Sequence, residues 1–250
     1  MAFEKIKRTF NRKAGEFPDK GRLITKDSHF TIIEAYKRMR TNLLFMLGKD
    51  KKVIAFTSTM ANEGKTTNCA NLGIAFAEAG NKTLIIDMDM RKPQIHNYFG
   101  FKASPGLSDV LAGFSKTAKI MKTDYQNLFV LPAGTPPPSP PELIMSDAFS
   151  ELVEELKKEY DYIFIDTPPV HLVTDLAVVA AMVDGVVFVV RERVVPLELL
   201  KKSVAGIERI GGKILGFVLN DSGQASTYLQ YRYRRKYANK YGYGYINKEE

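Results

Sequence analysis

Apolar and polar residues are arranged in two alternating patterns along this chain. Short apolar runs, rich in β-branched and aromatic residues, predict strands at 51–59, 82–90, 127–134, 160–169, 184–192 and 213–220. Segments whose apolar residues recur every three or four positions predict helices at 28–47, 66–80, 143–160 and 196–212, with a shorter helix inside 92–113. Strands that alternate with helices predict an α/β fold, in which helices cover both faces of a mostly parallel sheet.

Composition narrows this picture to one cytosolic domain. The 250 residues are 45% hydrophobic, which is enough for one sizeable core. The only cysteine is Cys69, so no internal disulfide forms, as suits a reducing compartment. The first residues are polar and basic without the apolar core of a signal peptide, and Asp184 interrupts the longest apolar stretch. We expect a soluble, cytoplasmic protein without a membrane span.

The positive charge is concentrated at the two ends of the chain. Net charge is +8, of which residues 1–26 contribute eight basic and three acidic residues and residues 228–250 six basic and two acidic. The nearly neutral body is not typical of a domain that lays one basic face along DNA, so no nucleic-acid partner is expected. We predict a basic arm at 1–26, a catalytic domain at 27–222 and a C-terminal tail at 223–250.

The C-terminal tail is unusually rich in tyrosine. Seven of the twelve tyrosines fall within YLQYRYRRKYANKYGYGY, where they alternate with Arg and Lys. They are Tyr228, Tyr231, Tyr233, Tyr237, Tyr241, Tyr243 and Tyr245. A segment without apolar periodicity cannot build a core. The interpretations open at this point are a solvated tail, an RNA-stacking segment, and a basic segment that meets anionic lipid, an acidic partner or an acidic groove on another copy of the protein.

The turn TSTMANEGKTT, at 57–67, lies between a predicted strand and a predicted helix, as a P-loop requires. Gly64, Lys65 and Thr66 fit the G-x-x-x-x-G-K-[ST] pattern, but Thr59 occupies the first glycine position. The backbone N–H groups of Asn62, Glu63, Gly64, Lys65, Thr66 and Thr67 can still surround phosphates at a helix N-terminus. Lys65 would reach the β- and γ-phosphates of ATP, and Thr66 would bind Mg²⁺.

Acidic residues end two other predicted strands. LIIDMDMRKP places Asp87 and Asp89 two positions apart at one strand end, so both carboxylates can face one site, and Arg91 follows. YIFIDTPP ends in Asp166, as in a Walker B element whose carboxylate holds Mg²⁺. The three motifs together indicate metal-assisted phosphoryl chemistry.

The order of these motifs resembles that of the deviant P-loop ATPases, and within them the bacterial tyrosine kinases (BY-kinases) that control capsule and exopolysaccharide synthesis. Three apolar residues followed by D-x-D-x-R resemble that family's Walker A′ motif, and GTPPPSPPELIMS resembles its Pro-rich loop. The similarity runs from about residue 28 to the C-terminal tyrosines. It implies a P-loop NTPase fold of the MinD and ParA type that uses ATP and Mg²⁺.

The resemblance also assigns roles by position. It implies catalytic roles for Lys65, Asp87, Asp89 and Arg91, with Asp87 or Asp89 taking the tyrosine proton. Thr66, Asp87 and Asp166 would hold the metal, and Asn220 would contact adenine. The seven C-terminal tyrosines would be autophosphorylated in trans.

Assembly and partners follow from the same resemblance. The helix at 28–47 matches the family's E-x-x-R-x-x-R oligomerisation motif imperfectly, because Glu34 and Arg40 fit but Lys37, with Arg38 beside it, replaces an arginine. An ordinary exposed helix face with a Glu34–Arg38 pair is the alternative. The family implies a ring-shaped homo-oligomer, a tyrosine phosphatase, and a separate membrane activator of the polysaccharide chain-length type that recruits the kinase to the inner face of the plasma membrane.

A positioning ATPase of the cell-division and plasmid-partition type is the alternative function. Such proteins normally carry a signature lysine five residues before the P-loop lysine, and Met60 stands there in this chain. They also have no use for a tyrosine-rich tail. The sequence therefore favours an autophosphorylating tyrosine kinase.

Overall fold

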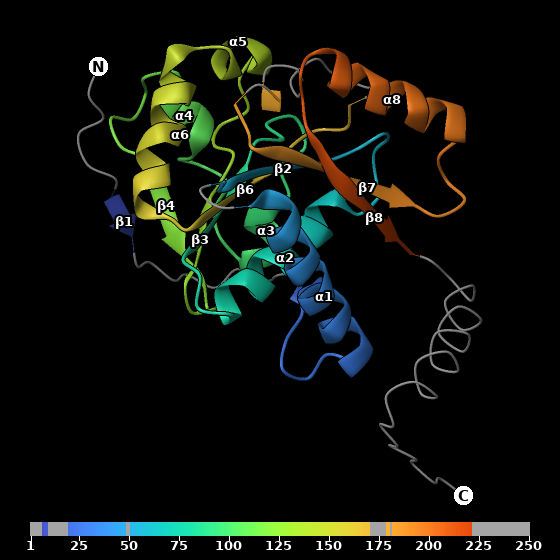
Figure 1. The fold of residues 1–250 in the computed structure, drawn as a ribbon. Helices are drawn as coiled ribbons and strands as arrows, with labels where there is room; N and C mark the ends of the chain where they lie inside the picture. The colour runs from blue at the N-terminus through green and yellow to red at the C-terminus, as the bar shows by residue number, and fades with distance from the viewer. Residues whose placement is uncertain (1–6, 10–19, 49–50, 171–178, 181, 222–250) are drawn as a thin grey trace, which may run out of the picture.

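The computed structural model describes residues 7–9, 20–48, 51–170, 179–180 and 182–221 (Figure 1). The predicted tail, with its seven tyrosines, lies outside these residues. The strands are β1 Lys7–Thr9, β2 Val53–Ser58, β3 Thr83–Asp87, β4 Lys119–Lys122, β5 Leu128–Leu131, β6 Tyr162–Asp166, β7 Gly185–Arg191 and β8 Ile214–Asn220. The helices are η1 Lys20–Arg22, α1 Phe30–Leu47, α2 Lys65–Glu78, α3 Ile95–Phe99, α4 Leu107–Leu111, α5 Pro140–Ile144, α6 Asp147–Glu159 and α8 Leu197–Arg209.

The strands form one sheet in the order β1-β4-β5-β3-β6-β2-β7-β8. Every neighbouring pair is parallel except β4 and β5, which are antiparallel. The predicted fold class, a mostly parallel α/β sheet, is therefore confirmed. The sequence pattern missed β1 and β4, because runs of three or four residues with lysine at their ends carry little periodicity.

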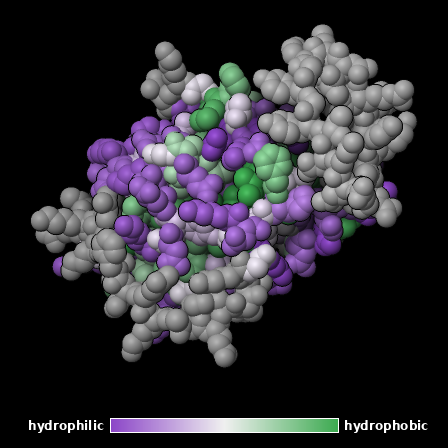
Figure 2. Space-filling view, turned by 90° about the horizontal axis from the view of Figure 1, so that it is seen from below, coloured by the Kyte–Doolittle hydropathy of each residue, from purple (hydrophilic) through white to green (hydrophobic). Residues whose placement is uncertain are grey.

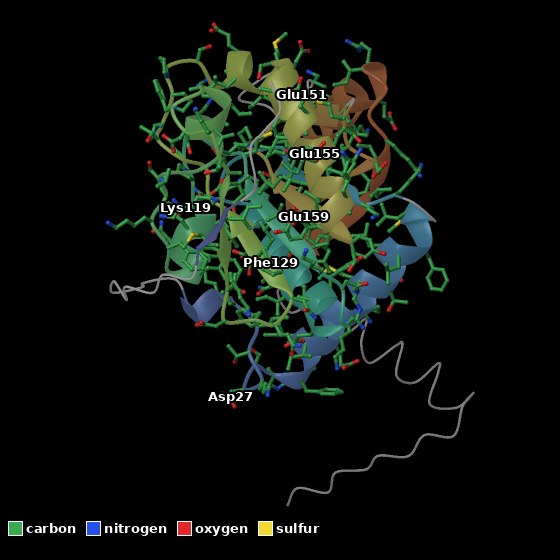
Figure 3. The ribbon with its side chains drawn as sticks, turned by 90° about the vertical axis from the view of Figure 1, so that its left-hand side faces the viewer. Asp27, Lys119, Phe129, Glu151, Glu155 and Glu159 are labelled. Carbon is green, nitrogen blue, oxygen red and sulfur yellow. The ribbon has the colours of Figure 1, made fainter. Side chains whose placement is uncertain are left out.

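Helices cover both faces of the sheet (Figure 1). One core cluster joins α4, α5, α6 and α8 to one face, and a second joins α1, α2 and α3 to the other. Leu152, Val153 and Leu156 of α6 are buried, while Glu151, Glu155 and Glu159 point outward (Figure 3). β2, β3 and β6 are buried on both faces. Their nearly continuous apolar composition follows from this, because a parallel sheet covered by helices exposes neither face.

Helix α1 follows its predicted amphipathic pattern only in part. The three- or four-residue spacing predicts one face made of Ile32, Tyr36, Met39, Leu43 and Leu47. Tyr36, Leu43 and Leu47 are buried as expected, but Ile32 is 48% exposed. Viewed from below, the described surface is largely hydrophilic with small separate hydrophobic areas (Figure 2). Among the helices in the described ranges, none has the length and hydropathy needed to cross a membrane.

The described part of the predicted basic arm packs against the domain. Leu23 and Ile24 are 7% and 5% exposed and belong to the same core cluster as α1 and α2. β1 pairs in parallel with β4 at the sheet edge. We therefore propose that the folded domain begins at or before Lys20, earlier than the predicted boundary at 27.

Candidate active site

The predicted P-loop connects β2 to the N-terminus of α2. Asn62 and Gly64 have positive φ angles of 65° and 90°, and Thr59 is not among the residues with positive φ. The φ angle of Gly64 is one that L side chains rarely adopt, and a Cβ atom there would also meet the side-chain nitrogen of Asn220, so this position favours glycine. The departure at Thr59 therefore imposes no left-handed backbone conformation, which explains how the turn forms without the first glycine.

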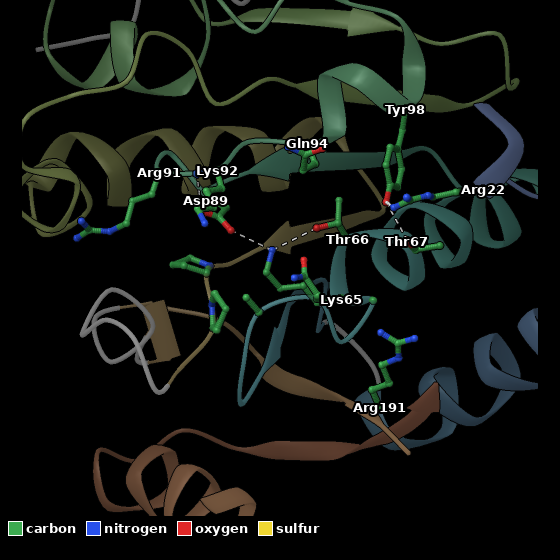
Figure 4. Close-up of a pocket in the computed structure, with 15 residues that line it drawn as sticks. Arg22, Lys65, Thr66, Thr67, Asp89, Arg91, Lys92, Gln94, Tyr98 and Arg191 are labelled. Atoms are coloured by element: carbon green, nitrogen blue, oxygen red, sulfur yellow. Dashed lines mark hydrogen bonds and ion pairs between the residues drawn. The ribbon is translucent and has the colours of Figure 1, made fainter. Parts of the chain in front are cut away.

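The ammonium group of Lys65 lies among carboxylates. Its Nζ atom is 3.1 Å from Oδ2 of Asp89 and 3.3 Å from Oδ1 of Asp166. The Thr66 hydroxyl donates a hydrogen bond to Asp166 at 2.7 Å. Burial lowers the pKa of Lys65, but the negative charges of Asp166, Asp89 and Asp87 outweigh burial and raise it overall. Lys65 is therefore a permanent cation at the centre of the site (Figure 4).

Asp87 and Asp166 stand opposite each other on the neighbouring strands β3 and β6, and both are fully buried. Burial and then the negative charge of Asp166 raise the pKa of Asp87 well above its usual value. Burial also raises the pKa of Asp166, against the lowering effect of Lys65. Asp87 accepts hydrogen bonds from the backbone N–H groups of Gln94 and Ile95, each at 3.1 Å. Asp166 and Asp89 share Lys65 as an ion-pair partner, and together with the buried Asp87 they form the floor of the site.

This floor suits a hard divalent cation. Within the described residues, no group of three or more His, Cys, Asp or Glu side chains is placed to hold a metal by itself. Asp87, Asp166 and the Thr66 hydroxyl nevertheless offer oxygen donors at one place. Mg²⁺ commonly takes one or two protein carboxylates and completes its coordination with water and substrate phosphates. The residues present therefore fit Mg²⁺ bound together with a nucleotide.

A cavity of about 620 Å³ opens above this floor (Figure 4). Seven of the predicted site residues line it, namely Asn62, Gly64, Lys65, Thr66, Thr67, Asp89 and Arg91. The lining also contains residues that the sequence analysis did not select, namely Arg22, Ala61, Lys92, Gln94, Tyr98, Pro168, Pro169 and Arg191. Arg22 and Arg191 come from segments far from the motifs in sequence, and no motif indicated them.

Glu63 and Asn220, the remaining residues predicted to bind nucleotide, do not line the cavity but form hydrogen bonds within and to the P-loop. The side chain of Asn220 donates a hydrogen bond to the carbonyl of Glu63 at 2.9 Å. The fully buried Glu63 carboxylate accepts hydrogen bonds from the backbone N–H groups of Met60 and of Arg191, the latter at 3.0 Å. Hydrogen bonds therefore connect the ends of β7 and β8 directly to the P-loop. The sequence does not indicate these contacts, because they depend on how the strands pair.

The four predicted oligomerisation residues lie on α1. Lys37 forms an exposed ion pair with Glu34 at 2.9 Å, so Glu34 pairs three residues along rather than with Arg38. Arg40 donates a hydrogen bond to the carbonyl of Ala75 at 2.6 Å, in the last turn of α2. Arg38 is exposed. Arg40 thus makes a contact within its own chain.

A P-loop, an acidic strand pair and a parallel sheet together define a P-loop nucleotide-binding domain. In agreement with this class, the family model described as "AAA domain" matches residues 51–215. Comparisons with known proteins define the family more narrowly. The chain is 40% identical over 194 residues to a putative tyrosine-protein kinase CapB of Staphylococcus aureus, an alignment that covers 76% of this chain and 84% of that protein.

Solved structures agree with this relationship. The chimerical protein CapA2B2 superposes with a TM-score of 0.72 at 37% identity, covering 81% of this chain and 93% of that one. The kinase domain of the Escherichia coli tyrosine kinase ETK superposes with a TM-score of 0.73 at 32% identity, covering 75% and 74%. This chain belongs to the bacterial tyrosine-protein kinases. The resemblance drawn from the motifs is confirmed, and the protein is an ATP-binding protein-tyrosine kinase.

Proposed function

We propose that this kinase phosphorylates the C-terminal tyrosines of neighbouring copies of itself and thereby regulates capsular or exopolysaccharide biosynthesis. The observation that carries the proposal is the position of Lys65, between Asp89 and Asp166 and beside the Thr66 hydroxyl, at the floor of an open cavity. This arrangement provides a phosphate-binding cation, metal-binding oxygens and a proton acceptor at one place.

Nucleotide binding would use the P-loop backbone and Lys65. N–H groups from Asn62 to Thr67 surround the phosphates, and Lys65 leaves its carboxylate partners to contact the β- and γ-phosphates. Asn220 already donates to the Glu63 carbonyl, which leaves its side-chain oxygen to accept from the amino group of adenine. Thr66, Asp87 and Asp166 would hold Mg²⁺, which neutralises phosphate charge when bound.

Proton transfer is better suited to Asp89 than to Asp87. A tyrosine hydroxyl has a pKa of about 10, so its oxygen needs a nearby carboxylate as it attacks phosphorus. Asp89 lines the cavity, whereas Asp87 is fully buried and accepts hydrogen bonds from backbone N–H groups at both oxygens. We therefore assign Asp89 as the proton acceptor. Arg91, at the rim beside it, would stabilise charge on the transferred group.

The C-terminal segment supplies the acceptor tyrosines. Residues 228–250 contain seven tyrosines and no apolar periodicity, so they are free to reach the site of a neighbouring copy. Within an oligomer, each tail is held near the neighbouring site at a high effective concentration. Transfer in trans follows from this arrangement.

Purified protein with ATP and Mg²⁺ should gain phosphate on residues 228–245, mapped by mass spectrometry. Lys65→Met should abolish the modification, whereas Lys158→Met, which removes an exposed lysine of α6, should not. Transfer in trans is tested by mixing Lys65→Met protein with an active variant whose seven tail tyrosines are phenylalanine. An unlabelled tail on the inactive partner, in the presence of a membrane activator's cytoplasmic segment, would refute the proposal.

Assembly should depend on phosphorylation. Each phosphate adds about −1.5 to −2 charges near pH 7, so about three phosphates reverse the charge of the tail, and contacts between copies that involve the basic tail should weaken. We propose contacts between copies through Glu34, Lys37, Arg38 and Arg40 of α1. Light scattering before and after incubation with ATP should record a decrease in size, and no decrease would contradict this part of the proposal.

The partners follow from the family. We propose a ring-shaped homo-oligomer that a separate membrane activator recruits to the inner face of the plasma membrane, and a tyrosine phosphatase that restores the unmodified tail. Activation is tested by adding the activator's cytoplasmic segment, which should tighten ATP binding and speed tail phosphorylation.

A further inference from the structure

The segment before α1 is fixed across the first turns of α2. The side chain of Asn71 accepts a hydrogen bond from the backbone N–H of Ile24 at 2.8 Å and donates one to the carbonyl of Arg22 at 3.0 Å. The hydroxyl of Tyr125 donates to the carbonyl of Ile24 at 2.9 Å. With Leu23 and Ile24 buried, these bonds fix the backbone that carries Arg22.

The side chain of Arg22 lines the nucleotide cavity next to the helix N-terminus. Its Nη1 atom lies 3.4 Å from the hydroxyl of Tyr98, and that hydroxyl lies 2.9 Å from Oγ1 of Thr67. Figure 4 places Arg22, Tyr98 and Thr67 together on one side of Lys65, and Asp89 with Arg91 on the other side. The cavity therefore has one cationic wall next to the carboxylates and another away from them.

These two walls indicate how a nucleotide lies in the cavity. Phosphoryl transfer takes place next to the metal-binding and proton-accepting carboxylates, so the γ-phosphate lies on the side of Asp89. The phosphate chain runs past Lys65 along the first turn of α2, which places the α-phosphate beside Thr67. Two arginines of the lining lie on that side: Arg191 pairs with Asp221 at 2.7 Å, and Arg22 lies beside Thr67.

We propose that Arg22 binds the α-phosphate of the nucleotide and that Tyr98 orients its guanidinium group. Arginine suits this role because it is always charged and its planar N–H groups match phosphate oxygens. Arg22 precedes the region 51–215 that the family model matches. The inference rests on the proposed orientation of ATP in this site, and it makes the segment before α1 part of the catalytic domain.

Arg22→Gln tests the inference in the full-length protein, with Mg²⁺-ADP and Mg²⁺-ATP binding measured by calorimetry. The α-phosphate is bound alike in the ground and transition states, so loss of one charged hydrogen bond should weaken both nucleotides by about tenfold. The KM for ATP should rise by a similar factor with kcat nearly unchanged. Arg22→Lys should recover part of the affinity, and Tyr98→Phe should weaken binding less than Arg22→Gln does.

Lys26→Gln is the matched control, because Lys26 is an exposed cation of the same segment and does not line the cavity. Its ADP affinity should equal that of the wild type. ADP affinity of Arg22→Gln equal to the wild type would overturn the inference. An equal loss of affinity for adenosine, which has no phosphate, would also overturn it by indicating a displaced segment. ADP binding does not involve the tail, so these results are independent of whether the tail is phosphorylated.

Discussion

The ammonium group of Lys65 lies 3.1 Å from the carboxylate of Asp89, although one belongs to the P-loop and the other follows β3. The lysine proposed to bind phosphate is therefore paired with the carboxylate proposed to accept the tyrosine proton. Asp89 would thus have two effects: it competes with phosphate for Lys65, and it accepts the tyrosine proton.

Asp89→Asn separates these two effects. Loss of the competing carboxylate should tighten ATP binding by about fivefold, the equivalent of about 1 kcal/mol. Loss of the proton acceptor should lower kcat for tyrosine phosphorylation by about 10² to 10⁴. Calorimetry with ATP and a steady-state assay measure the two quantities. A fall in ATP affinity without a fall in kcat would contradict the assignment of Asp89.

Glu63→Ala should loosen the P-loop. The substitution leaves the partly buried N–H groups of Met60 and Arg191 without their charged acceptor, and each such loss costs about 1–2 kcal/mol. We expect the free energy of unfolding to fall by about 2–4 kcal/mol and the KM for ATP to rise at least about tenfold, since phosphate-binding N–H groups are no longer held. Glu63→Gln, which keeps one acceptor, should be intermediate.

Glu154→Ala is a suitable control for Glu63, because Glu154 is an exposed residue of α6 that pairs with Lys157 on the same helix. Denaturant unfolding and ATP kinetics should match the wild type. An unchanged KM in Glu63→Ala would mean that the end of β7 does not position the P-loop.

Restoring the usual first glycine of the P-loop should not improve this enzyme. Thr59 is fully buried and does not adopt a positive φ angle. Thr59→Gly increases the entropy of the unfolded chain and removes buried methyl contacts, so we expect a loss of about 1–2 kcal/mol in unfolding free energy. ATP affinity should not increase. A clear gain in ATP affinity, measured beside Thr59→Ser as control, would contradict this view.

Asp109 gives stability a defined pH dependence. Its carboxylate accepts hydrogen bonds from Gly106 N–H at 2.7 Å, Thr135 N–H at 3.2 Å and the Ser104 hydroxyl at 3.3 Å, which ties the Pro-rich loop to α4. Burial by itself raises the pKa of Asp109, but the hydrogen bonds from Thr135, Gly106 and Ser104 outweigh it and lower the pKa below 3.8. The stabilisation is present above the unfolded-state pKa and is lost as pH falls through the lower folded-state pKa.

Asp109→Asn should therefore lower the unfolding free energy by about 1.5–3 kcal/mol near neutral pH. The difference from the wild type should stay constant from about pH 7 to pH 5 and shrink below about pH 4. Denaturant titrations across this range measure it, with the exposed Asp27→Asn as control. A difference that does not change with pH would show that the charge of Asp109 is unimportant.

The sequence by itself determined the architecture and the P-loop. Apolar runs marked β2, β3, β5, β6, β7 and β8, and the runs of β2, β3 and β6 lack polar alternation because these strands are buried on both faces. The strand–turn–helix position of Gly64, Lys65 and Thr66, and acidic residues at two strand ends, indicated the groups that we propose as catalytic. Local sequence is sufficient there, because parallel strands bring their carboxyl ends to one edge.

Tertiary structure decided which distant segments complete the site. The pairing of β7 with β2 and β8 brings Arg191 and Asn220 to Glu63, and no pattern near Glu63 specifies that contact. The sequence predicts a basic arm at the N-terminus because eight of residues 1–26 are lysine or arginine. Nothing in the sequence marks Leu23 and Ile24 as part of the core. Their burial, and with it the place of Arg22 in the cavity, depends on hydrogen bonds to Asn71 and Tyr125, which lie far away in sequence and become neighbours only when the chain folds.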